Sequence, residues 1–414
     1  FRFVANTVYS NHPSAGAYRG YGATQGVFAM ENTVNLMAHK LGIDPVKIRE
    51  HNMLHEGDIM TAYNNETANA CALDQCMARC KEMMDWDSKF PAKTLPNGHI
   101  RSVGVAMAMQ GSCISFVDEA NVTIKMNDDG FYSLLVGSTD MGTGSDTILA
   151  QMAADVLECD LDDVVTYGVD TDTSPYDSGS YASSTTYLTG NAVVKAAEQL
   201  RQNITEQAAK RLECPKDEVA FDGKILTCVS TGSSITLKEL ANQLQGGTEG
   251  WQSVTAGGNS PVSPPPYMVG MAEIDVDPET GKVVPIKYTA CVDCGTVVNP
   301  NLARVQTEGG LMQGLGMALY EGQNYNGTGF NRMRNLMQYK IPTRMDIPEI
   351  EVDFRQSYEP TGPFGAKSIG EIVINTPSPA IAHAIFNATG VMHHELPIMP
   401  EHVWRGIQEK KQQG

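Results

Sequence analysis

A segment rich in glycine, serine and proline, residues 246–266, divides this chain of 414 residues into two unequal parts. Segments of this composition are typical of linkers between folded units. A single hydrophobic core rarely grows beyond about 250–300 residues, so a chain of this length is expected to build more than one. The sequence therefore predicts one unit over residues 1–245 and a second over residues 246–414.

Both parts contain helical and strand patterns. Apolar residues recur at steps of three and four between Thr24 and Lys40, and Gly42 follows, which predicts a helix that ends there. The alternation over residues 120–126, a turn at 127–130 and an apolar return over 131–136 predict a β-hairpin. Further helices are expected over residues 191–212 and 303–319, and a strand over residues 1–9. Because these elements lack regular βαβ alternation, we predict an α+β fold of mixed sheets and helices in two layered subdomains.

The charge of the chain limits its partners. Its formal net charge is −18, from 48 acidic and 30 basic side chains, which argues against a nucleic acid or an anionic membrane as partner.

No run approaches the roughly 20 apolar residues of a membrane-spanning helix, and no signal peptide opens the chain. The strand expected at the first residue suggests a processed product or a part of a longer polypeptide.

The nine cysteines are scattered and odd in number, which predicts reduced, buried thiols and a cytoplasmic protein. Cys71, Cys76 and Cys80 have near-helical spacing, and Cys291 and Cys294 form an isolated CxxC. A structural metal would need a second pair or nearby histidines. No four-cysteine pattern for an iron–sulfur cluster is present in the sequence.

The strongest candidate for a catalytic residue is Glu371, at the end of the loop Gly-Pro-Phe-Gly-Ala-Lys-Ser-Ile-Gly-Glu that begins at Gly362. Gly365 and Gly370 allow the backbone to approach another group closely. A lone carboxylate in apolar surroundings can exchange protons near neutral pH. Alternatively, Glu371 only occupies the first turn of a helix, where acidic residues are common. These residues alone leave both interpretations open.

Two further segments could bind an anion. Residues 137–144 (Gly-Ser-Thr-Asp-Met-Gly-Thr-Gly) lie between a predicted strand and a predicted helix, where backbone N–H groups form a cradle. The segment lacks the Gly-Lys-Ser/Thr of a P-loop and the spacing of a Rossmann fingerprint, so a generic glycine-rich turn is the alternative. Residues 182–185 (Ala-Ser-Ser-Thr) offer hydroxyl groups that could bind a ligand or cap a helix.

Five segments, in this order along the chain, together resemble the molybdenum hydroxylase family of xanthine dehydrogenases and aldehyde oxidoreductases. They are residues 17–22 (Ala-Tyr-Arg-Gly-Tyr-Gly), 137–144, 182–185, 304–316 and 365–371. The resemblance extends from about residue 10 to the C-terminus and is weakest over residues 214–260. It implies the C-terminal half of a molybdopterin-binding subunit.

The resemblance implies specific roles for these residues. Glu371 would be the general base that takes a proton from a hydroxyl on molybdenum, whose oxygen then attacks an electron-poor carbon while hydride moves to a sulfido or selenido ligand. The pterin dithiolene, and no protein side chain, would hold the metal. Asp140 and Thr143 stand where the family has Glu and Gln. The residues expected to contact the cofactor are Arg19, Gly137, Met141, Gly142, Thr143, Gly144, Ala182, Ser183, Ser184, Thr185, Gln306 and Gly370.

The substrate pocket would be formed by Arg19, Tyr21, Gln110 and Phe116, with the ring of Tyr21 stacked on a planar substrate. Gly20 stands where CO dehydrogenases of the family have a copper-binding cysteine. These residues favour an N-heteroaromatic substrate such as a purine or nicotinate, hydroxylated with oxygen from water. Aldehyde oxidation, a cofactor-binding scaffold without turnover, and a nucleotide-binding protein are the alternatives.

The resemblance also implies partner chains. The two electrons removed from the substrate need iron–sulfur clusters and FAD, which we expect on separate subunits. The N-terminal half of the molybdopterin unit must also come from elsewhere. We therefore expect a hetero-oligomer that could also dimerise. The cofactor would be molybdopterin, either as the mononucleotide or as a cytosine dinucleotide.

Overall fold

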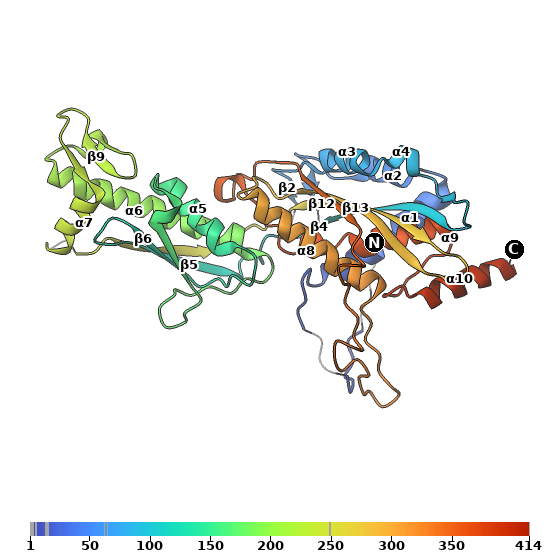
Figure 1. The fold of residues 1–414 in the computed structure, drawn as a ribbon. Coiled ribbons are helices and arrows are strands. Elements are labelled where there is room, and N and C mark those ends of the chain that lie inside the picture. Colours follow the sequence, from blue (N-terminus) through green and yellow to red (C-terminus); the bar gives the residue numbers. More distant parts are fainter. Residues whose placement is uncertain are drawn as a thin grey trace.

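The computed structural model describes residues 4, 6–12, 16–61, 63, 65–247 and 250–413. They form two lobes that lie side by side (Figure 1). The smaller lobe contains a sheet with strand order β11-β5-β6-β7, and the larger lobe a sheet with order β14-β13-β12-β4-β3. Most neighbouring strands are antiparallel, whereas β6–β7 and β13–β14 are parallel. The prediction of an α+β fold with mixed sheets is confirmed.

The elements have the following bounds. The helices are α1 (Ala23–Leu41), α2 (Pro45–Asn52), α3 (Leu73–Met84), α4 (Trp86–Lys89), α5 (Ser145–Leu157), α6 (Gly190–Arg211), α7 (Leu237–Gln245), α8 (Pro300–Leu319), α9 (Pro377–Thr389) and α10 (Pro400–Gln413). Short helical turns are η1 (Leu161–Asp163), η2 (Thr185–Thr189), η3 (Lys216–Glu218), η4 (Pro363–Gly365) and η5 (Ile372–Ile374). The strands are β1 (Ile59–Met60), β2 (Glu66–Thr67), β3 (Lys93–Thr94), β4 (Ile100–Met109), β5 (Glu119–Met126), β6 (Tyr132–Val136), β7 (Val164–Gly168), β8 (Val219–Phe221), β9 (Ile225–Cys228), β10 (Ser234–Thr236), β11 (Ser253–Asn259), β12 (Tyr267–Val276), β13 (Val283–Asp293) and β14 (Glu349–Phe354).

Local signals explain several of these bounds. Helix α1 ends at Gly42, whose φ of 66° is readily adopted by glycine. Helix α2 begins after Asp44, whose carboxylate accepts from the N–H groups of the next turn, with Pro45 as the first helical residue. Helix α7 begins with a capping box between Thr236 and Glu239. The helices predicted over residues 24–40, 191–212 and 303–319 are confirmed as α1, α6 and α8.

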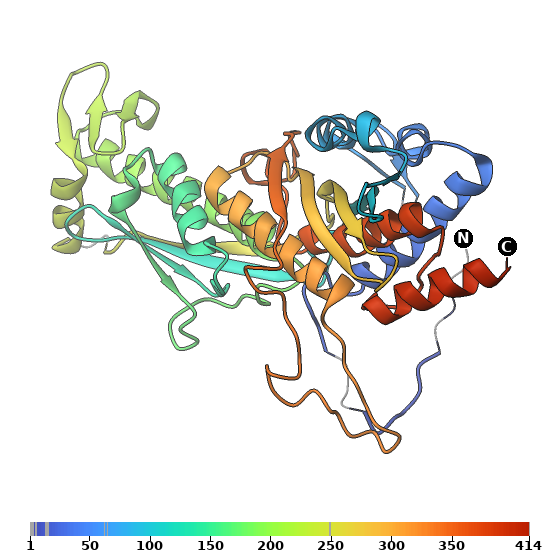
Figure 2. The same ribbon diagram turned by 45° about the vertical axis from the view of Figure 1, so that its right-hand side comes forward.

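The larger lobe has three layers (Figure 2). Strand β12 lies at the centre of its sheet, and every one of its residues is buried. Helix α3 packs on one face of β12 and β13, and α9 packs on the opposite face against β4 and β12. Helix α8 packs against α9 and η5. Because helices cover both faces of the sheet, the sequence of β12 is almost continuously apolar.

The smaller lobe has one hydrophobic core between its sheet and helices α5 and α6. Strands β5 and β6 form the predicted hairpin, and the residues of β5 alternate between buried and more exposed positions. A small sheet with order β10-β9-β8 lies with α7 at the end of this lobe far from α8 (Figure 1).

The two lobes do not follow the predicted division at residues 246–266. Strand β4 from the first part pairs with β12, and β11 from the second part pairs with β5. Each large sheet therefore combines strands from both predicted units, 1–245 and 246–414. The physical reason is that the apolar strand β12 needs a hydrogen-bonding neighbour on each side, and β4 supplies one of them.

Two sequence predictions need correction. Residues 4 and 6–9 lie in no strand, and the other residues of the predicted strand 1–9 lie outside the described residues. Seven cysteines are free, but Cys214 and Cys228 form a disulfide, so the prediction of reduced thiols is wrong for this pair. The two residues come together because β9 returns toward the end of α6.

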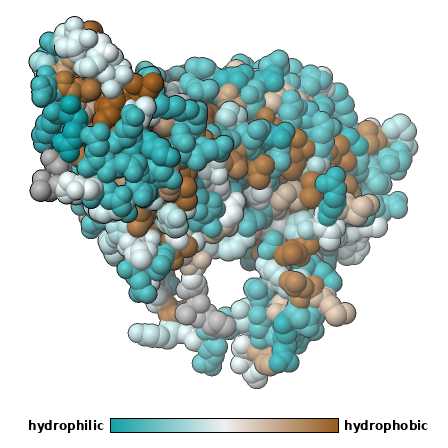
Figure 3. All heavy atoms as spheres, turned by 60° about the vertical axis from the view of Figure 1, so that its left-hand side comes forward, coloured by the Kyte–Doolittle hydropathy of each residue, from teal (hydrophilic) through white to brown (hydrophobic). Residues whose placement is uncertain are grey.

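The surface is predominantly hydrophilic on the face shown in Figure 3, with hydrophobic residues in scattered patches. In the described part of the chain, we find no helix with both the length and the apolar character needed to cross a bilayer.

Candidate active site

Glu371 lies at the end of the loop that precedes η5, and its side chain is partly buried. Oε1 accepts a hydrogen bond from the backbone N–H of Gly20 at 3.2 Å. Oε2 accepts from Nε2 of Gln110 at 3.0 Å and from the hydroxyl of Ser183 at 3.2 Å. The expectation of apolar surroundings is therefore wrong, because three polar donors face the carboxylate. Although Glu371 occupies the N-cap position of η5, its side chain does not cap that turn.

Gln110 is held in one orientation by a second amide. Nδ2 of Asn375 donates to Oε1 of Gln110 at 2.7 Å, which leaves the NH2 group of Gln110 facing Glu371. Asn375 is buried, at 1% exposure, and follows η5 directly. Sequence reasoning missed Asn375, because a polar residue four positions after Glu371 carries no signal of this contact.

The site leaves no room for a side chain at Gly20. Its φ is +76°, and an added Cβ would lie 2.6 Å from Cγ2 of Ile374 and 2.8 Å from Oδ1 of Asn375. A side chain here would therefore displace the N–H group that reaches Glu371. The next residue, Tyr21, has a side chain that is 69% exposed.

Arg19 joins the Glu371 loop to helix α8. Its Nε donates to the carbonyl of Gly370 at 2.5 Å, and one terminal nitrogen donates to Oε1 of Gln313 at 3.2 Å. The other terminal nitrogen donates to both the carbonyl and Oε1 of Gln306 at 3.1 Å. Burial lowers the pKa of Arg19, and the charge of Glu371 acts in the opposite direction. Gln313 was not anticipated from the sequence.

The glycine-rich segment 137–144 is ordered by its own aspartate. Oδ1 of Asp140 accepts from the backbone N–H groups of Gly142, Thr143 and Gly144 at 2.8–3.1 Å. Burial alone raises the pKa of Asp140, but these backbone donors outweigh it and lower the pKa below its ordinary value. The N–H groups expected to cradle an anion are thus already satisfied. The carbonyl of Gly142 accepts from Nε2 of Gln306 at 3.2 Å, which links this segment to α8.

The segment 182–185 contributes hydroxyl groups from a strained turn. Ala182 and Ser183 have φ values of 51° and 59°, in the left-handed region that side chains rarely adopt. This turn directs the hydroxyl of Ser183 to Glu371. The hydroxyl of Ser184 instead donates to the carbonyl of Gly179 at 3.0 Å.

A cavity of about 730 Å³, including its open mouth, lies beside this network. Both lobes line it, with serine and threonine side chains beside apolar ones. The hydroxyl oxygens of Ser145 and Ser368 are buried in its wall and have no hydrogen-bond partner among the described residues. The cavity therefore offers unused polar groups to a ligand. Of the residues predicted to contact a cofactor, those that line it are Thr143, Ser183, Thr185, Gln306 and Gly370.

Other predicted site residues lie outside the cavity lining. The side chains of Met141 and Phe116 are 65% and 69% exposed. Gly137 has a packing role, because an added Cβ would lie 2.6 Å from the carbonyl oxygen of Pro175. Gly142, Gly144, Ala182 and Ser184 shape the neighbouring backbone. The lining residues that sequence reasoning missed include Ser145, Ser180, Thr186, Cys294, Thr296, Asn299 and Ser368.

A buried ion pair anchors the loop that carries Glu371. Nζ of Lys367 lies 3.0 Å from Oδ2 of Asp293, and both side chains are fully buried. Lys367 also donates to the carbonyl of Ala70 at 3.0 Å. Asp293 further accepts from the N–H groups of Ala72 and Gly295 at 2.8 and 2.9 Å. The side chain of Lys367 therefore has a structural role: it fixes the loop to Asp293 and Ala70.

Known proteins resemble this chain in sequence. A family model for the molybdopterin cofactor-binding domain matches residues 79–348, and a second model of the same description matches residues 1–53. The chain is 33% identical over 419 residues to the xanthine dehydrogenase molybdenum-binding subunit of Escherichia coli O157:H7, covering 98% of this chain and 55% of that protein. The chain belongs to the molybdenum hydroxylase family. Its sequence is also 37% identical over 425 residues to the probable hypoxanthine oxidase XdhD of E. coli K12, covering 98% of this chain and 43% of that protein.

Solved structures of molybdenum hydroxylases share the fold. The aldehyde oxidoreductase of Desulfovibrio gigas is 26% identical with a TM-score of 0.77, and the match covers 95% of this chain and 42% of that chain. Quinoline 2-oxidoreductase of Pseudomonas putida 86 has a TM-score of 0.87 at 24% identity, covering 95% of this chain and 53% of that chain. The chain spans about half the length of the curated relatives it matches.

Proposed function

We propose that this chain is the base-bearing half of the molybdopterin unit of a hydroxylase that acts on an electron-poor carbon of an N-heteroaromatic substrate, with water as the oxygen source. The observation that carries the proposal is the set of hydrogen bonds that Glu371 accepts. Its carboxylate is oriented by Gly20, Gln110 and Ser183. A base must have its accepting oxygens held toward the proton it removes, and these donors arrive from three separate segments.

The cavity beside Glu371 fits the cofactor that the family binds. Thr143, Ser183, Thr185, Gln306 and Gly370 would hold the pterin and its phosphate, and the unpartnered hydroxyls of Ser145 and Ser368 supply further donors. When bound, the molybdenum cofactor supplies the activated oxygen and accepts the two electrons removed from the substrate. Chemical analysis of the isolated cofactor would distinguish a mononucleotide from a cytosine dinucleotide, and a sulfido from a selenido terminal ligand.

The chain's own groups perform four tasks in this proposal. Glu371 takes a proton at one of its carboxylate oxygens when the oxygen nucleophile forms, and returns it to solvent after turnover. Gln110 and Ser183 hold the receiving carboxylate in place, since both donate to Oε2. Arg19 holds the Glu371 loop against α8, because it donates to the carbonyls of both Gly370 and Gln306. The exposed ring of Tyr21, next to Gly20, would stack on the substrate.

The substrate class is argued from relatives and from Tyr21. The names of two relatives refer to heteroaromatic compounds: the probable hypoxanthine oxidase XdhD, at 37% identity, and the nicotine 6-hydroxylase large subunit of Paenarthrobacter nicotinovorans, at 27%. Aldehyde oxidation is the second candidate, because the aldehyde oxidoreductase of Megalodesulfovibrio gigas is 28% identical. We favour the purine or nicotinate class.

The proposal includes partner chains. The chain spans 43–55% of the relatives named above, so the N-terminal half of the molybdopterin unit would come from further polypeptide. Iron–sulfur and FAD subunits would carry electrons away, in a cytoplasmic hetero-oligomer that could also dimerise.

The test is an assay of the purified complex with an artificial electron acceptor against purines, pyridine carboxylates and aldehydes. We expect the highest kcat/KM with a heteroaromatic substrate. Preference for aldehydes would favour the second candidate. A complex that contains molybdenum but oxidises none of these compounds would contradict the proposal and favour a scaffold without turnover.

A further inference from the structure

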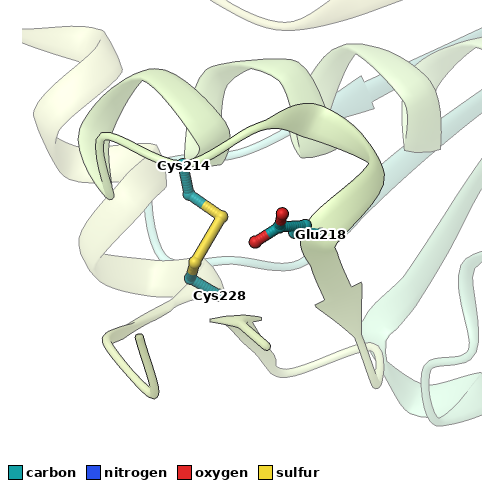
Figure 4. A group of neighbouring side chains, drawn as sticks. All are labelled: Cys214, Glu218 and Cys228. Atoms are coloured by element: carbon teal, nitrogen blue, oxygen red, sulfur yellow. A yellow bond between two sulfur atoms is a disulfide. The ribbon is translucent and has the colours of Figure 1, made fainter. Parts of the chain in front are cut away.

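A second cluster of ligand-type side chains lies in the small sheet region of the smaller lobe. Cys214 lies just beyond the end of α6, Glu218 ends η3 and Cys228 ends β9 (Figure 4). The two sulfur atoms and one carboxylate oxygen of Glu218 lie within 4.8 Å of one another. In the structure, Cys214 and Cys228 are joined by a disulfide. Among the described residues, this is the one group of three or more such side chains with this proximity.

One carboxylate oxygen of Glu218 has no hydrogen-bond partner among the described residues. Its Oε2 is buried and accepts no hydrogen bond from any described residue. Figure 4 shows the carboxylate turned toward the sulfur atoms. The nearby ammonium of Lys216 pairs with Glu206 instead. A buried carboxylate oxygen without a donor is unfavourable, and a neutral disulfide does not compensate it, whereas a cation would.

We propose that Cys214, Glu218 and Cys228 form a binding site for Zn²⁺ when the disulfide is reduced. Two thiolates and one carboxylate are ligands that zinc accepts, with water in the fourth position of a tetrahedral site. Thiolate ligands favour zinc over magnesium or calcium. The site needs little rearrangement, because the backbone already brings the three groups together: the carbonyl of Glu218 accepts from the N–H of Val229 at 2.9 Å, beside Cys228.

Reduction of the Cys214–Cys228 disulfide requires a reductant, such as a dithiol. Two electrons from the dithiol break the S–S bond, two protons bind the released sulfurs, and the dithiol becomes a cyclic disulfide. Zn²⁺ then displaces both protons as it binds the two thiolates. The disulfide and the metal therefore exclude each other, yet each ties the end of α6 to β9. Under either redox condition, one cross-link would hold the small sheet to the lobe.

This site is separate from the proposed catalytic function. The small sheet lies at the end of the smaller lobe far from α8 (Figure 1). Zinc binding can thus fail while the hydroxylase assignment holds, and the reverse also applies.

The experiment is a zinc titration of the purified complex. The complex is reduced with a phosphine, freed of reductant without oxygen, and titrated with Zn²⁺ against a chromophoric chelator. We expect one more tightly bound zinc per chain in the wild type than in the Cys214→Ser/Cys228→Ser double variant. The unreduced complex should bind like the double variant. This comparison subtracts the other thiols and any metal on partner chains.

A single variant decides whether Glu218 is a ligand. Glu218→Gln leaves both cysteines able to pair, and we expect it to weaken zinc binding roughly 10-fold or more, since even indirect partners of a metal contribute 10- to 100-fold. The control is Glu213→Gln, which removes an exposed carboxylate beside Cys214. With Co²⁺ in place of Zn²⁺, a thiolate charge-transfer band should appear only when both cysteines are present. Equal zinc stoichiometry in the wild type and the double variant, or unchanged affinity in Glu218→Gln, would overturn the proposal.

Discussion

Gln110 donates from Nε2 to Oε2 of Glu371 over 3.0 Å, although 261 residues separate them in the sequence. Gly20, 351 residues before Glu371, and Ser183, 188 residues before it, complete the set of donors. The carboxylate is therefore held by contacts across the whole chain, and changes at distant residues should affect it in measurable ways.

The direct test of the base is Glu371→Gln. The amide keeps the size of the side chain but cannot accept a proton, so we expect turnover to fall by about 10²–10⁴, the usual contribution of general-base catalysis. Molybdenum and pterin content, measured on the same preparation, should stay near that of the wild type. Turnover close to wild type would refute the assignment.

Asn375→Ala tests whether the orientation of Gln110 matters. Without the bond from Asn375, the Gln110 amide can rotate and present its carbonyl to the carboxylate. Loss of one such hydrogen bond costs about 1–1.5 kcal/mol, so we expect kcat to fall roughly 10-fold with KM little changed. Steady-state kinetics at fixed cofactor content provide the measurement. The exposed Asn52→Ala is the control, and equal kcat in both variants would show that Asn375 has no positioning role.

Arg19→Lys should weaken cofactor retention. A lysine ammonium has three donors on one nitrogen and cannot reproduce the four hydrogen bonds that the planar guanidinium makes to Gly370, Gln306 and Gln313. Each lost charge-assisted bond costs about 1.5–3 kcal/mol, so we expect cofactor loss during repeated dilution to become at least ~10-fold faster. The readout is molybdenum per chain after gel filtration. Unchanged retention would mean that Arg19 does not stabilise the cofactor cavity.

The Lys367–Asp293 pair predicts a large loss of stability in Lys367→Met. Removing the lysine leaves a fully buried, charged Asp293 without its cation. Breaking a buried pair in this way costs about 3–5 kcal/mol, measurable by chemical unfolding. The matched control is Arg405→Met, which breaks an ion pair with Glu401 at the surface and should cost below about 1 kcal/mol. Similar losses in the two variants would contradict the anchoring role of Lys367.

His383 predicts an acid-dependent loss of stability. Complete burial, assisted by the charge of Arg49, lowers the pKa of His383 to about 3 from 6.5, and its Nδ1 accepts from the N–H of Val105. Below pH 6.5 the His383 imidazole is protonated in the unfolded chain but stays neutral in the folded chain. The free energy of unfolding therefore falls as the pH drops toward 3. The contribution approaches about 1.4 kcal/mol per pH unit within this window.

The measurement for His383 is the free energy of unfolding between pH 6.5 and 4.5. His383→Asn retains an acceptor for Val105 but does not titrate, so its slope against pH should be shallower than that of the wild type. His55→Asn, at a half-exposed position, should retain the wild-type slope. Parallel curves for the wild type and His383→Asn would contradict this prediction.

The sequence predicted local features better than distant pairings. Helix α1 and the β5–β6 hairpin follow from short-range periodicity and turn residues, and both formed as expected. The pairing of β4 with β12 joins segments more than 150 residues apart and has no local signal, so the division at residues 246–266 separated strands that share a sheet. Apolar patterns identify strands but do not specify their neighbours.

The candidate site shows the same contrast. Motif resemblance selected Glu371, Arg19, Gln110 and Ser183, which the fold brings into one network. Asn375 was missed, since its role depends on how one amide faces another. The satisfied N–H groups of the 137–144 segment were also unforeseen, although an aspartate ahead of glycines commonly binds its own backbone.

The spread of Glu371's donors along the chain has a consequence for biosynthesis. Gly20, Gln110 and Ser183 leave the ribosome well before residue 371 is added, so a growing chain cannot complete the hydrogen bonds to the Glu371 carboxylate. If the proposed function holds, the metal cofactor would enter a finished site only after translation of this segment. A shortened chain that ends before residue 371 would fold, at best, around an incomplete pocket.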